Sequence, residues 1–274
     1  MVRDLARDFA DSEIAPRAEH FDRHKEFPYD VVAKLAELGF LGLPVSEEYG
    51  GAGADTLTYA LAIEEISRGD ASVGITVAAH TSLGTAPFLL FGTEAQKQEF
   101  VPPLASGEKL WSFGLTEPNA GSDAGATQTR AQLRDGQWAI NGVKSFITNS
   151  GTTISGGVTI TAVTGTRSDG KPEISNIIVP AGTPGYTVSK DYDQMGWRAS
   201  DTHELVFSDA CVSEGHLLGH RGEGFHQFLS VLDGGRISVA ALSVGLAQAC
   251  YDASFKYATE RVQFGKPISK FQAI

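Results

Sequence analysis

Apolar residues in the first part of the chain recur at the spacing of amphipathic helices. Between residues 31 and 38 they repeat every three or four positions, until Gly39 interrupts the pattern. Residues 57–66 show the same period, which predicts a second helix of this kind. The following stretch, 71–90, is too uniformly apolar to have a solvent-exposed face, and it therefore predicts helices at the centre of the protein.

A helix-start signal follows this apolar stretch. Thr93 and Gln96 have the spacing of a capping box, which predicts a short helix that Pro102 and Pro103 would end. No strand pattern precedes residue 110. Residues 1–110 therefore predict an all-α N-terminal domain.

The pattern changes to that of a β domain between residues 111 and 221. This part is rich in Thr, Val, Ile and Gly, and the pairs Asp135-Gly136 and Asn141-Gly142 each separate two β-prone runs. Such pairs favour the positive φ angles of two-residue hairpin turns. We therefore expect a small β-barrel or sandwich. Its predicted strands are 129–133, 137–140 and 143–148 as a meander, followed by 158–163, 174–180 and 204–207.

A helical pattern returns at residue 225. Residues 237–251 are uncharged and dense in Ala, Gly and Ser, a composition typical of a helix packed closely against other helices. Such a helix needs neighbours, so we expect either that the helical start of the chain and other subunits cover it, or that the sequence is a fragment. The predicted fold class is thus α+β multidomain, with a third domain over 222–274 that is the incomplete first part of a C-terminal helical bundle.

Composition narrows the function classes. The formal net charge of −11 argues against a nucleic-acid-binding protein, which needs clustered basic residues. A hydrophobic content of 42% excludes a disordered chain. The longest uncharged run, 71–93, contains His80, Pro87 and several hydroxyl residues, so we expect buried helices there and no membrane span.

Cysteine usage and the N-terminal sequence favour a cytoplasmic protein. Cys211 and Cys250 are too few for a disulfide framework or a cysteine-rich zinc site. Residues 1–19 carry charges throughout and lack the apolar core of a signal peptide. The seven histidines do not have a regular metal-binding spacing, and the sequence contains no Walker loop or dinucleotide fingerprint.

A loop rich in small residues, LTEPNAGSD at 115–123, joins the predicted helical and β parts. Its backbone N–H groups could approach a ligand closely, although composition alone favours an ordinary surface turn. Four further strings follow: KSFITN at 144–149, MGWRASDT at 195–202, LDGGR at 232–236 and ERVQFG at 260–265. Together, and in this order, they resemble the acyl-CoA dehydrogenases, flavoproteins that desaturate acyl-CoA thioesters.

The resemblance implies FAD as the cofactor and assigns two groups of residues to the flavin ring. The first lies in the loop at 115–123 and just before it: Phe113, Leu115, Thr116, Gly121 and Ser122. The second is Phe146, Ile147 and Thr148, where Phe146 replaces the more usual Trp. Fixed hydrogen-bond donors in the first group would stabilise the negative charge that develops near N1 and O2 of a reduced flavin. Without the resemblance, the second group is also compatible with the ordinary alternation of a strand.

A third group would reach the flavin of another subunit. Arg261, Gln263, Phe264 and Gln272 match positions that contact the adenine–pyrophosphate end of FAD in a neighbouring chain, which implies a homo-oligomer. Without the resemblance, an exposed helix end explains these residues equally well.

The resemblance also assigns substrate contacts. Ser122, Asp233 and Arg236 match positions that contact the CoA part of the substrate, and the rigid donor fork of arginine suits a phosphate-bearing ligand. Without it, the i, i+3 pair Asp233–Arg236 would be interpreted as a solvated ion pair.

The residue that removes the α-proton is not expected within this chain. In most members it is a Glu in a later helical segment, beyond Ile274, and in a minority it occupies the position of Gly235, which has no side chain. We therefore expect flavin-dependent dehydrogenation of an acyl-CoA to the trans-2-enoyl-CoA, with an electron-transfer flavoprotein as acceptor, but little activity from this chain alone. Two alternatives stay open: a non-catalytic acyl-CoA- or flavin-binding or structural subunit that needs a partner, and a flavin oxidase or monooxygenase on the same scaffold.

Overall fold

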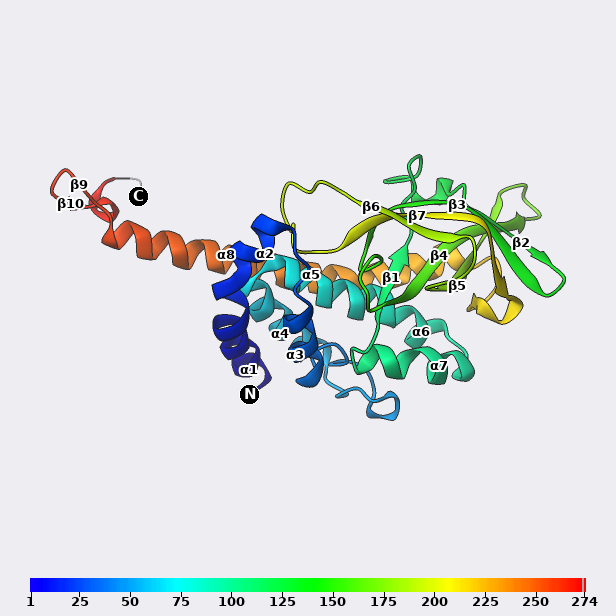
Figure 1. Ribbon diagram of the computed structural model, residues 1–274, viewed down its shortest axis with the longest axis horizontal. Coiled ribbons are helices and arrows are strands. Elements are labelled where there is room, and N and C mark those ends of the chain that lie inside the picture. The colour runs from blue at the N-terminus through cyan, green and yellow to red at the C-terminus, as the bar shows by residue number, and fades with distance from the viewer. Residues whose placement is uncertain (273) are drawn as a thin grey trace.

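The computed structural model describes residues 1–272 and 274, and its N-terminal part is helical (Figure 1). The helices are α1 (Val2–Phe9), α2 (Ala15–His24), α3 (Tyr29–Glu37), α4 (Thr56–Gly69), α5 (Ala71–Ala79), α6 (Ala86–Phe91) and α7 (Glu94–Ala105). Two π-helical turns, η1 (Ala10–Ile14) and η3 (His80–Thr85), join α1 to α2 and α5 to α6. These helices confirm the predicted all-α character of the segment before residue 110.

The two ends of α7 show how far local signals determine this part. Thr93 and Gln96 form the predicted capping box, in which the backbone N–H of each donates to the side chain of the other. The predicted stop at Pro102 and Pro103 is wrong, because α7 continues to Ala105. The carbonyls that the two prolines leave without a helical N–H belong to the exposed turn at 98–99, where water can reach them, while the buried Leu104 holds the last turn in place.

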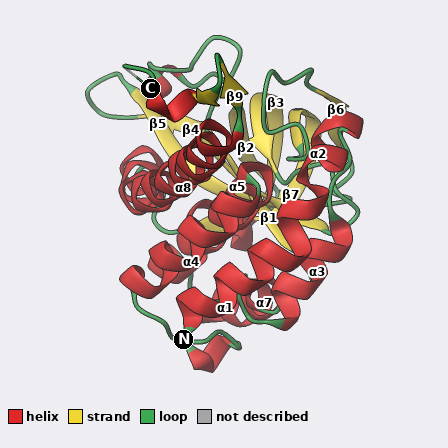
Figure 2. Cartoon of the chain, turned by 90° about the vertical axis from the view of Figure 1, so that its left-hand side faces the viewer, coloured by secondary structure: helices red, strands yellow, loops and turns green. Residues whose placement is uncertain are grey.

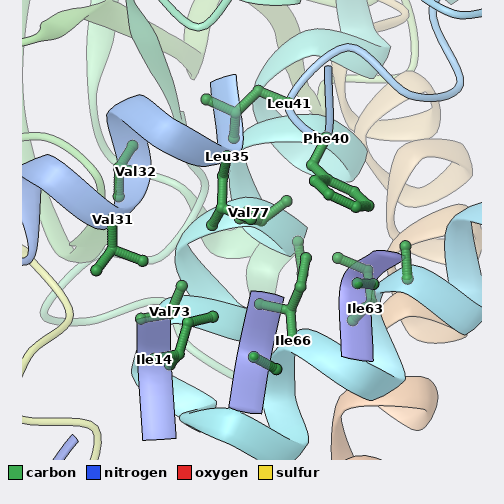
Figure 3. Packing of buried hydrophobic residues seen from close by; sticks show 14 of the residues in the cluster. Ile14, Val31, Val32, Leu35, Phe40, Leu41, Ile63, Ile66, Val73 and Val77 are labelled. Atoms are coloured by element: carbon green, nitrogen blue, oxygen red, sulfur yellow. The ribbon is translucent and has the colours of Figure 1, made fainter. Parts of the chain in front are cut away.

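The helices α3, α4 and α5 pack around one apolar core (Figure 3). Leu35 from α3, Ile66 from α4, and Val73 and Val77 from α5 are all fully buried in it. Burying an aliphatic side chain of this size contributes about 1.5–3 kcal/mol each. This core fixes the position of α5 and η3, which form one wall of the site described below.

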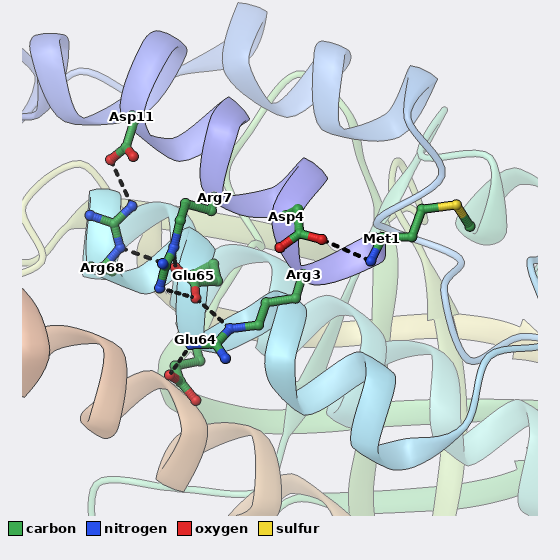
Figure 4. Close-up of polar contacts among 8 residues, drawn as sticks. All are labelled: Met1, Arg3, Asp4, Arg7, Asp11, Glu64, Glu65 and Arg68. Atoms are coloured by element: carbon green, nitrogen blue, oxygen red, sulfur yellow. Dashed lines mark hydrogen bonds and ion pairs between the residues drawn. The ribbon is translucent and has the colours of Figure 1, made fainter.

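A buried carboxylate joins α1 to α4 at the edge of this core (Figure 4). Glu65 is 1% exposed and accepts hydrogen bonds from Arg3 at 2.8 Å, from Arg7 at 2.7 and 3.0 Å, and from Arg68 at 3.1 Å. Burial alone would raise the pKa of Glu65, but the hydrogen bonds from the arginines outweigh it and lower that pKa to about 2. The carboxylate is therefore ionised at neutral pH.

We expect Glu65→Gln to lower the free energy of unfolding by about 2 kcal/mol at pH 7, because it removes charge-assisted hydrogen bonds at a buried site. Its pKa lies below the ordinary 4.5, so Glu65 stabilises the protein above pH 4.5 and loses this contribution as the pH falls toward 2. The difference between wild type and variant in urea unfolding should shrink over that window. Glu64→Gln is the matched control: Glu64 has one 3.8 Å contact with Arg3, so a loss as large as that of Glu65→Gln would contradict the prediction.

The middle of the chain forms an eight-stranded sheet within the described residues. Its strands are β1 (Leu110–Gly114), β2 (Arg130–Arg134), β3 (Gln137–Thr148), β4 (Ser155–Thr166), β5 (Pro172–Pro180), β6 (Tyr186–Asp191), β7 (Thr202–Ser213) and β8 (Leu217–Leu218). The order is β6-β7-β3-β2-β4-β5-β8, and β1 pairs with β4 in parallel. The sequence of helices, then sheet, then helix confirms the predicted α+β fold class.

The two predicted hairpin turns have different outcomes. Asp135 and Gly136 have φ angles of 49° and 76° and connect β2 to β3, so this turn is confirmed. The turn at Asn141-Gly142 is wrong, because β3 runs through both residues and the register of its pairing with β7 shifts there. This shift is a β-bulge, in which the Asn141 side-chain amide donates to the Asp209 carboxylate at 2.8 Å and accepts from the Asp209 backbone N–H at 2.9 Å.

The C-terminal part is dominated by one long helix, α8 (Gly224–Glu260), which ends near a small hairpin of β9 (Val262–Gln263) and β10 (Lys266–Pro267). Along its first half, α8 packs beside α4 and α5 (Figure 2). Its buried residues end at Gly245, and the rest of the helix extends away from the body of the protein (Figure 1). The close packing predicted for 237–251 is therefore present only on one face and only in its first part.

Two helical stretches in the described part of the chain are long and apolar enough to cross a membrane, Ala71–Phe91 and α8. Of the apolar window, 61% is buried inside the protein in the first and 33% in the second. The first stretch is thus a core element, as its uniform apolarity predicts.

Candidate functional site

A cleft of about 210 Å³ opens where the helices meet the sheet. Residues from α5, η3, β1, β3 and α8 and from the loop after β1 line it: Ala79, Leu83, Trp111, Phe113, Leu115, Thr116, Phe146, Ile147, Thr148 and Leu232. Six of the eight residues that the sequence assigns to the flavin ring are among them, from two segments about 30 positions apart in the chain. The sheet brings these segments together because the loop after β1 hydrogen-bonds to β3, with Ser145 N–H donating to the Thr116 carbonyl at 2.8 Å.

Two hydroxyl groups in this apolar cleft are free to bind a ligand. Thr116 and Thr148 are half-buried, and neither side chain makes a hydrogen bond to another described residue. A partly desolvated hydroxyl without a partner gains from a ligand that supplies a polar edge. The remaining lining is aliphatic or aromatic, so the cleft suits a ligand that is flat and apolar over most of its surface.

Phe146 presents an aromatic face at the rim of the cleft. It is 63% exposed and its φ is +61°, in the left-handed region that a bulky residue rarely adopts. The strain occurs at a β-bulge, since the register of β3 against β7 shifts between Lys144 and Ile147. The ring stacks on Tyr192 with centroids 4.6 Å apart. The bulge thus holds an aromatic surface beside the two free hydroxyls.

On the other side of the cleft, Phe113 anchors β1 to α8. Its ring stacks on Phe228, which is 1% exposed, with centroids 3.9 Å apart. Because Leu232 lies one turn further along α8 than Phe228, this stacking also fixes the part of α8 that lines the cleft.

A buried histidine supports the start of β1. The ring of His80 lies between the Leu104 carbonyl, 3.0 Å from Nε2, and the Trp111 N–H, which donates to Nδ1 over 3.2 Å. Nε2 must therefore carry the proton, so the histidine is neutral. Burial lowers the pKa of His80 to about 4, against a smaller opposing effect of the Leu104 carbonyl. His80 is a core residue with both ring nitrogens paired, as its place in an apolar run predicts.

The sequence-based prediction missed the ion pair directly behind the cleft. Lys144 and Glu117 are buried, and Lys144 Nζ lies 2.7 Å from Glu117 Oε1. Both residues belong to the strings that carry the family resemblance. The available signal was a lysine at a position of β3 that faces inward with Leu205 and Ile160, where strand alternation calls for an apolar residue.

Some predicted residues lie outside the cleft. Gly121 and Ser122 are exposed in the loop before β2 and do not line it. Arg261, Gln263, Phe264 and Gln272 are exposed near the far end of α8, away from the sheet (Figure 1). They therefore do not line the cleft that contains the other predicted flavin contacts.

The predicted substrate contacts on α8 lie next to the cleft. Asp233 and Arg236 form an ion pair with each other, and both side chains are largely exposed. Arg236 is four positions after Leu232 and therefore lies on the same side of α8 as this lining residue. An arginine at this place could pair with a phosphate group of a ligand that enters the cleft.

No carboxylate lines the cleft in the described part of the chain. The family's minority position for the base is Gly235, which is buried against η3: a Cβ added there would lie 2.7 Å from Cδ2 of Leu83. A side chain at this position would have to displace Leu83 from the cleft wall. The described residues also hold no group of three or more His, Cys, Asp or Glu side chains that could bind a metal ion.

Comparisons with known proteins agree across the whole chain. Family models for the acyl-CoA dehydrogenase N-terminal, middle and C-terminal domains match residues 1–108, 112–210 and 222–274. The probable acyl-CoA dehydrogenase YngJ of Bacillus subtilis is 55% identical over 274 residues, which are 100% of this chain and 72% of that protein.

Two solved structures have the same fold. Butyryl-CoA dehydrogenase from Megasphaera elsdenii is 43% identical with a TM-score of 0.94, over 99% of this chain and 71% of that one. A chain in the structure reported for the electron transferring flavoprotein of Acidaminococcus fermentans is 44% identical with a TM-score of 0.94, over 100% and 71% of the two chains.

Proposed function

Because the chain belongs to the acyl-CoA dehydrogenase family, whose members are FAD-dependent oxidoreductases, we propose that its cleft binds the isoalloxazine ring of FAD and takes part in acyl-CoA dehydrogenation. The product would be the trans-2-enoyl-CoA. The observation that carries this proposal is the cleft itself, in which the free hydroxyls of Thr116 and Thr148 lie beside the exposed ring of Phe146. These groups match a flat heteroaromatic ring with a polar edge.

When bound, FAD supplies the two-electron oxidant of the reaction. The residues of this chain orient the ring: Thr116 and Thr148 donate hydrogen bonds to its polar edge, and Phe146 packs against it. Leu83 and Leu232 keep water from the reacting carbon atoms, which strengthens the hydrogen bonds that polarise the thioester. We assign Leu115 and Ile147 to the same apolar wall of the cleft. Phe113 anchors this wall on α8.

We also propose that Asp233 and Arg236 bind the CoA part of the substrate beside the cleft, together with Ser122 from the loop after β1. Arg236 would exchange its contact with Asp233 for a phosphate oxygen, at little cost because the pair is exposed to solvent. Butyryl-CoA is the first substrate to test, given the similarity to the Megasphaera elsdenii enzyme.

The reaction also needs a base for the α-proton, and we propose that the cleft residues of this chain do not provide one. The chain by itself would then bind flavin and thioester but turn over slowly. The chain spans 72% of the length of the Bacillus subtilis relative.

Further assignments complete the proposal. Arg261, Gln263, Phe264 and Gln272 would contact the adenine–pyrophosphate end of FAD in a second copy of the chain, which makes the protein a homo-oligomer. We propose an electron-transfer flavoprotein as the electron acceptor, a cytoplasmic location, and three domains over 1–110, 111–221 and 222–274.

The test is an absorption spectrum of the purified chain with FAD, before and after anaerobic addition of butyryl-CoA. We expect a protein-bound flavin spectrum that changes on binding of the thioester and bleaches slowly. A spectrum that changes but never bleaches would favour the acyl-CoA- and flavin-binding subunit, and oxygen consumption during turnover would favour an oxidase. A chain that takes up no FAD at any concentration would overturn the proposal.

A further inference from the structure

The buried pair Glu117–Lys144 lies directly behind the wall of the cleft. Lys144 is 0% exposed and precedes Phe146 by two residues on β3, while Glu117, 5% exposed, follows Thr116 in the loop after β1. The pair therefore connects the two segments that carry the cleft's free hydroxyls and its aromatic face.

Every proton of the Lys144 ammonium has an acceptor. Nζ lies 2.7 Å from Glu117 Oε1, 2.9 Å from Thr161 Oγ1, 3.2 Å from Thr127 Oγ1 and 3.2 Å from the backbone carbonyl of Leu115. Because Leu115 lines the cleft, the ammonium donates a hydrogen bond to the backbone of a residue in the cleft wall. Thr161 belongs to β4, which ties the ammonium to the centre of the sheet.

The Glu117 carboxylate also accepts hydrogen bonds from residues 127–129, in addition to its contact with Lys144. The donors are the backbone N–H of Gln128 at 2.6 Å and of Thr129 at 3.1 Å, and the Thr127 hydroxyl. Burial would raise the pKa of Glu117, but the charge of Lys144 outweighs this and lowers it to about 2. Burial lowers the pKa of Lys144 to about 8, against the charge of Glu117. Both groups are thus charged at pH 7.

Stability alone does not account for such a pair. Removing two charges from water costs about as much as their attraction returns, so well-packed apolar residues of similar volume usually stabilise a fold at least as well. An apolar pair, however, could not donate a hydrogen bond to the Leu115 carbonyl or accept one from the 127–129 turn. What this pair adds is a fixed position for the backbone of the loop.

We propose that Glu117 and Lys144 are a positioning pair, which holds residues 115–117 against β3 so that Leu115 and Thr116 form the cleft wall. Through the Thr116 carbonyl, which accepts from Ser145 N–H at 2.8 Å, the loop and strand then keep one register. The effect on the loop does not depend on the proposed function, whereas the consequence for FAD rests on it.

The first test is hydrogen–deuterium exchange of the full 274-residue chain without FAD. In Lys144→Met we expect the amides of Glu117 and Ser145, which donate to the carbonyls of Ala120 and Thr116, to exchange at least tenfold faster than in wild type. The double variant Glu117→Gln/Lys144→Met leaves no unpaired charge, so its melting temperature should lie nearer to that of wild type. The amides of residues 117 and 145 should still exchange at least tenfold faster, since methionine cannot donate to the Leu115 carbonyl. Lys171→Met, at an exposed lysine in the turn between β4 and β5, should leave these amides unchanged.

Exchange of the amides of residues 117 and 145 within twofold of wild type in a folded double variant would overturn the proposal. The second test is the FAD dissociation constant, which should rise at least tenfold in the double variant while the other amides of the sheet stay protected. An unchanged dissociation constant would also overturn the positioning role. If wild type takes up no FAD but the exchange result holds, the proposed function fails and the positioning pair stands.

Discussion

Replacing Gly245 by alanine is expected to lower the free energy of unfolding by about 2 kcal/mol, because α8 and α4 touch backbone to backbone at this position. A Cβ added to Gly245 would lie 2.0 Å from the carbonyl oxygen of Glu64 and 3.1 Å from the backbone nitrogen of Arg68. A backbone atom cannot rotate away as a side chain can, so the two helices would have to separate.

The same helix offers a matched control of opposite sign. Gly234 is exposed on α8, and a Cβ added there meets no atom within 4 Å. Alanine is favoured over glycine inside a helix by about 0.8–1.0 kcal/mol, so Gly234→Ala should stabilise the protein. Urea unfolding of both variants is the measurement. If Gly245→Ala were as stable as Gly234→Ala, the close approach of α8 to α4 would be wrong.

His80→Phe is expected to destabilise the protein by about 3 kcal/mol at pH 7, since it leaves the Leu104 carbonyl and the Trp111 N–H buried without partners. The effect should depend on pH in a defined direction. The pKa of His80 is about 4 in the folded protein and 6.5 ordinarily, so the unfolded chain binds the extra proton between these values. Wild type therefore has the full contribution above pH 6.5 and loses it, by about 3 kcal/mol, as the pH falls toward 4.

Phenylalanine cannot take up a proton, so the difference between wild type and His80→Phe should shrink over this window. Chemical unfolding at several pH values between 7 and 4 measures it. His24→Phe, at an exposed histidine, is the control, and its free energy of unfolding at pH 7 should stay within about 0.5 kcal/mol of wild type. A difference between wild type and His80→Phe that stays constant from pH 7 to pH 4 would refute the assignment of a neutral, buried His80.

Local sequence signals predicted much of the fold because the interactions behind them occur between residues close together in the sequence. The capping box at Thr93 and the turn at Asp135-Gly136 both form as expected, since each depends on bonds between near neighbours. The Asn141-Gly142 pair has the same local chemistry but lies on a strand whose partner, β7, is about 65 positions away. Pairing with this distant strand keeps Asn141 and Gly142 in β3 instead of a turn, and local sequence periodicity carries no information about such long-range pairing.

The site divides in the same way. The strings at 115–123 and 144–149 identified residues that the sheet brings into one cleft, among them Thr116 and Thr148. They did not indicate that Lys144 would be buried behind Leu115, because that contact depends on how β1, β3 and β4 come together. Nor could the sequence show that Ser122 lies outside the cleft lining, because the loop has no periodic pattern that places its side chains.

The most direct test of the flavin cleft is a fluorescence titration of the chain with FAD, comparing wild type with Thr116→Val/Thr148→Val. Two lost hydrogen bonds of about 1 kcal/mol each should raise the dissociation constant at least tenfold. Thr153→Val, which changes an exposed threonine in the turn between β3 and β4, should bind as wild type does. Equal dissociation constants for all three proteins would contradict the placement of the flavin ring between these two hydroxyls.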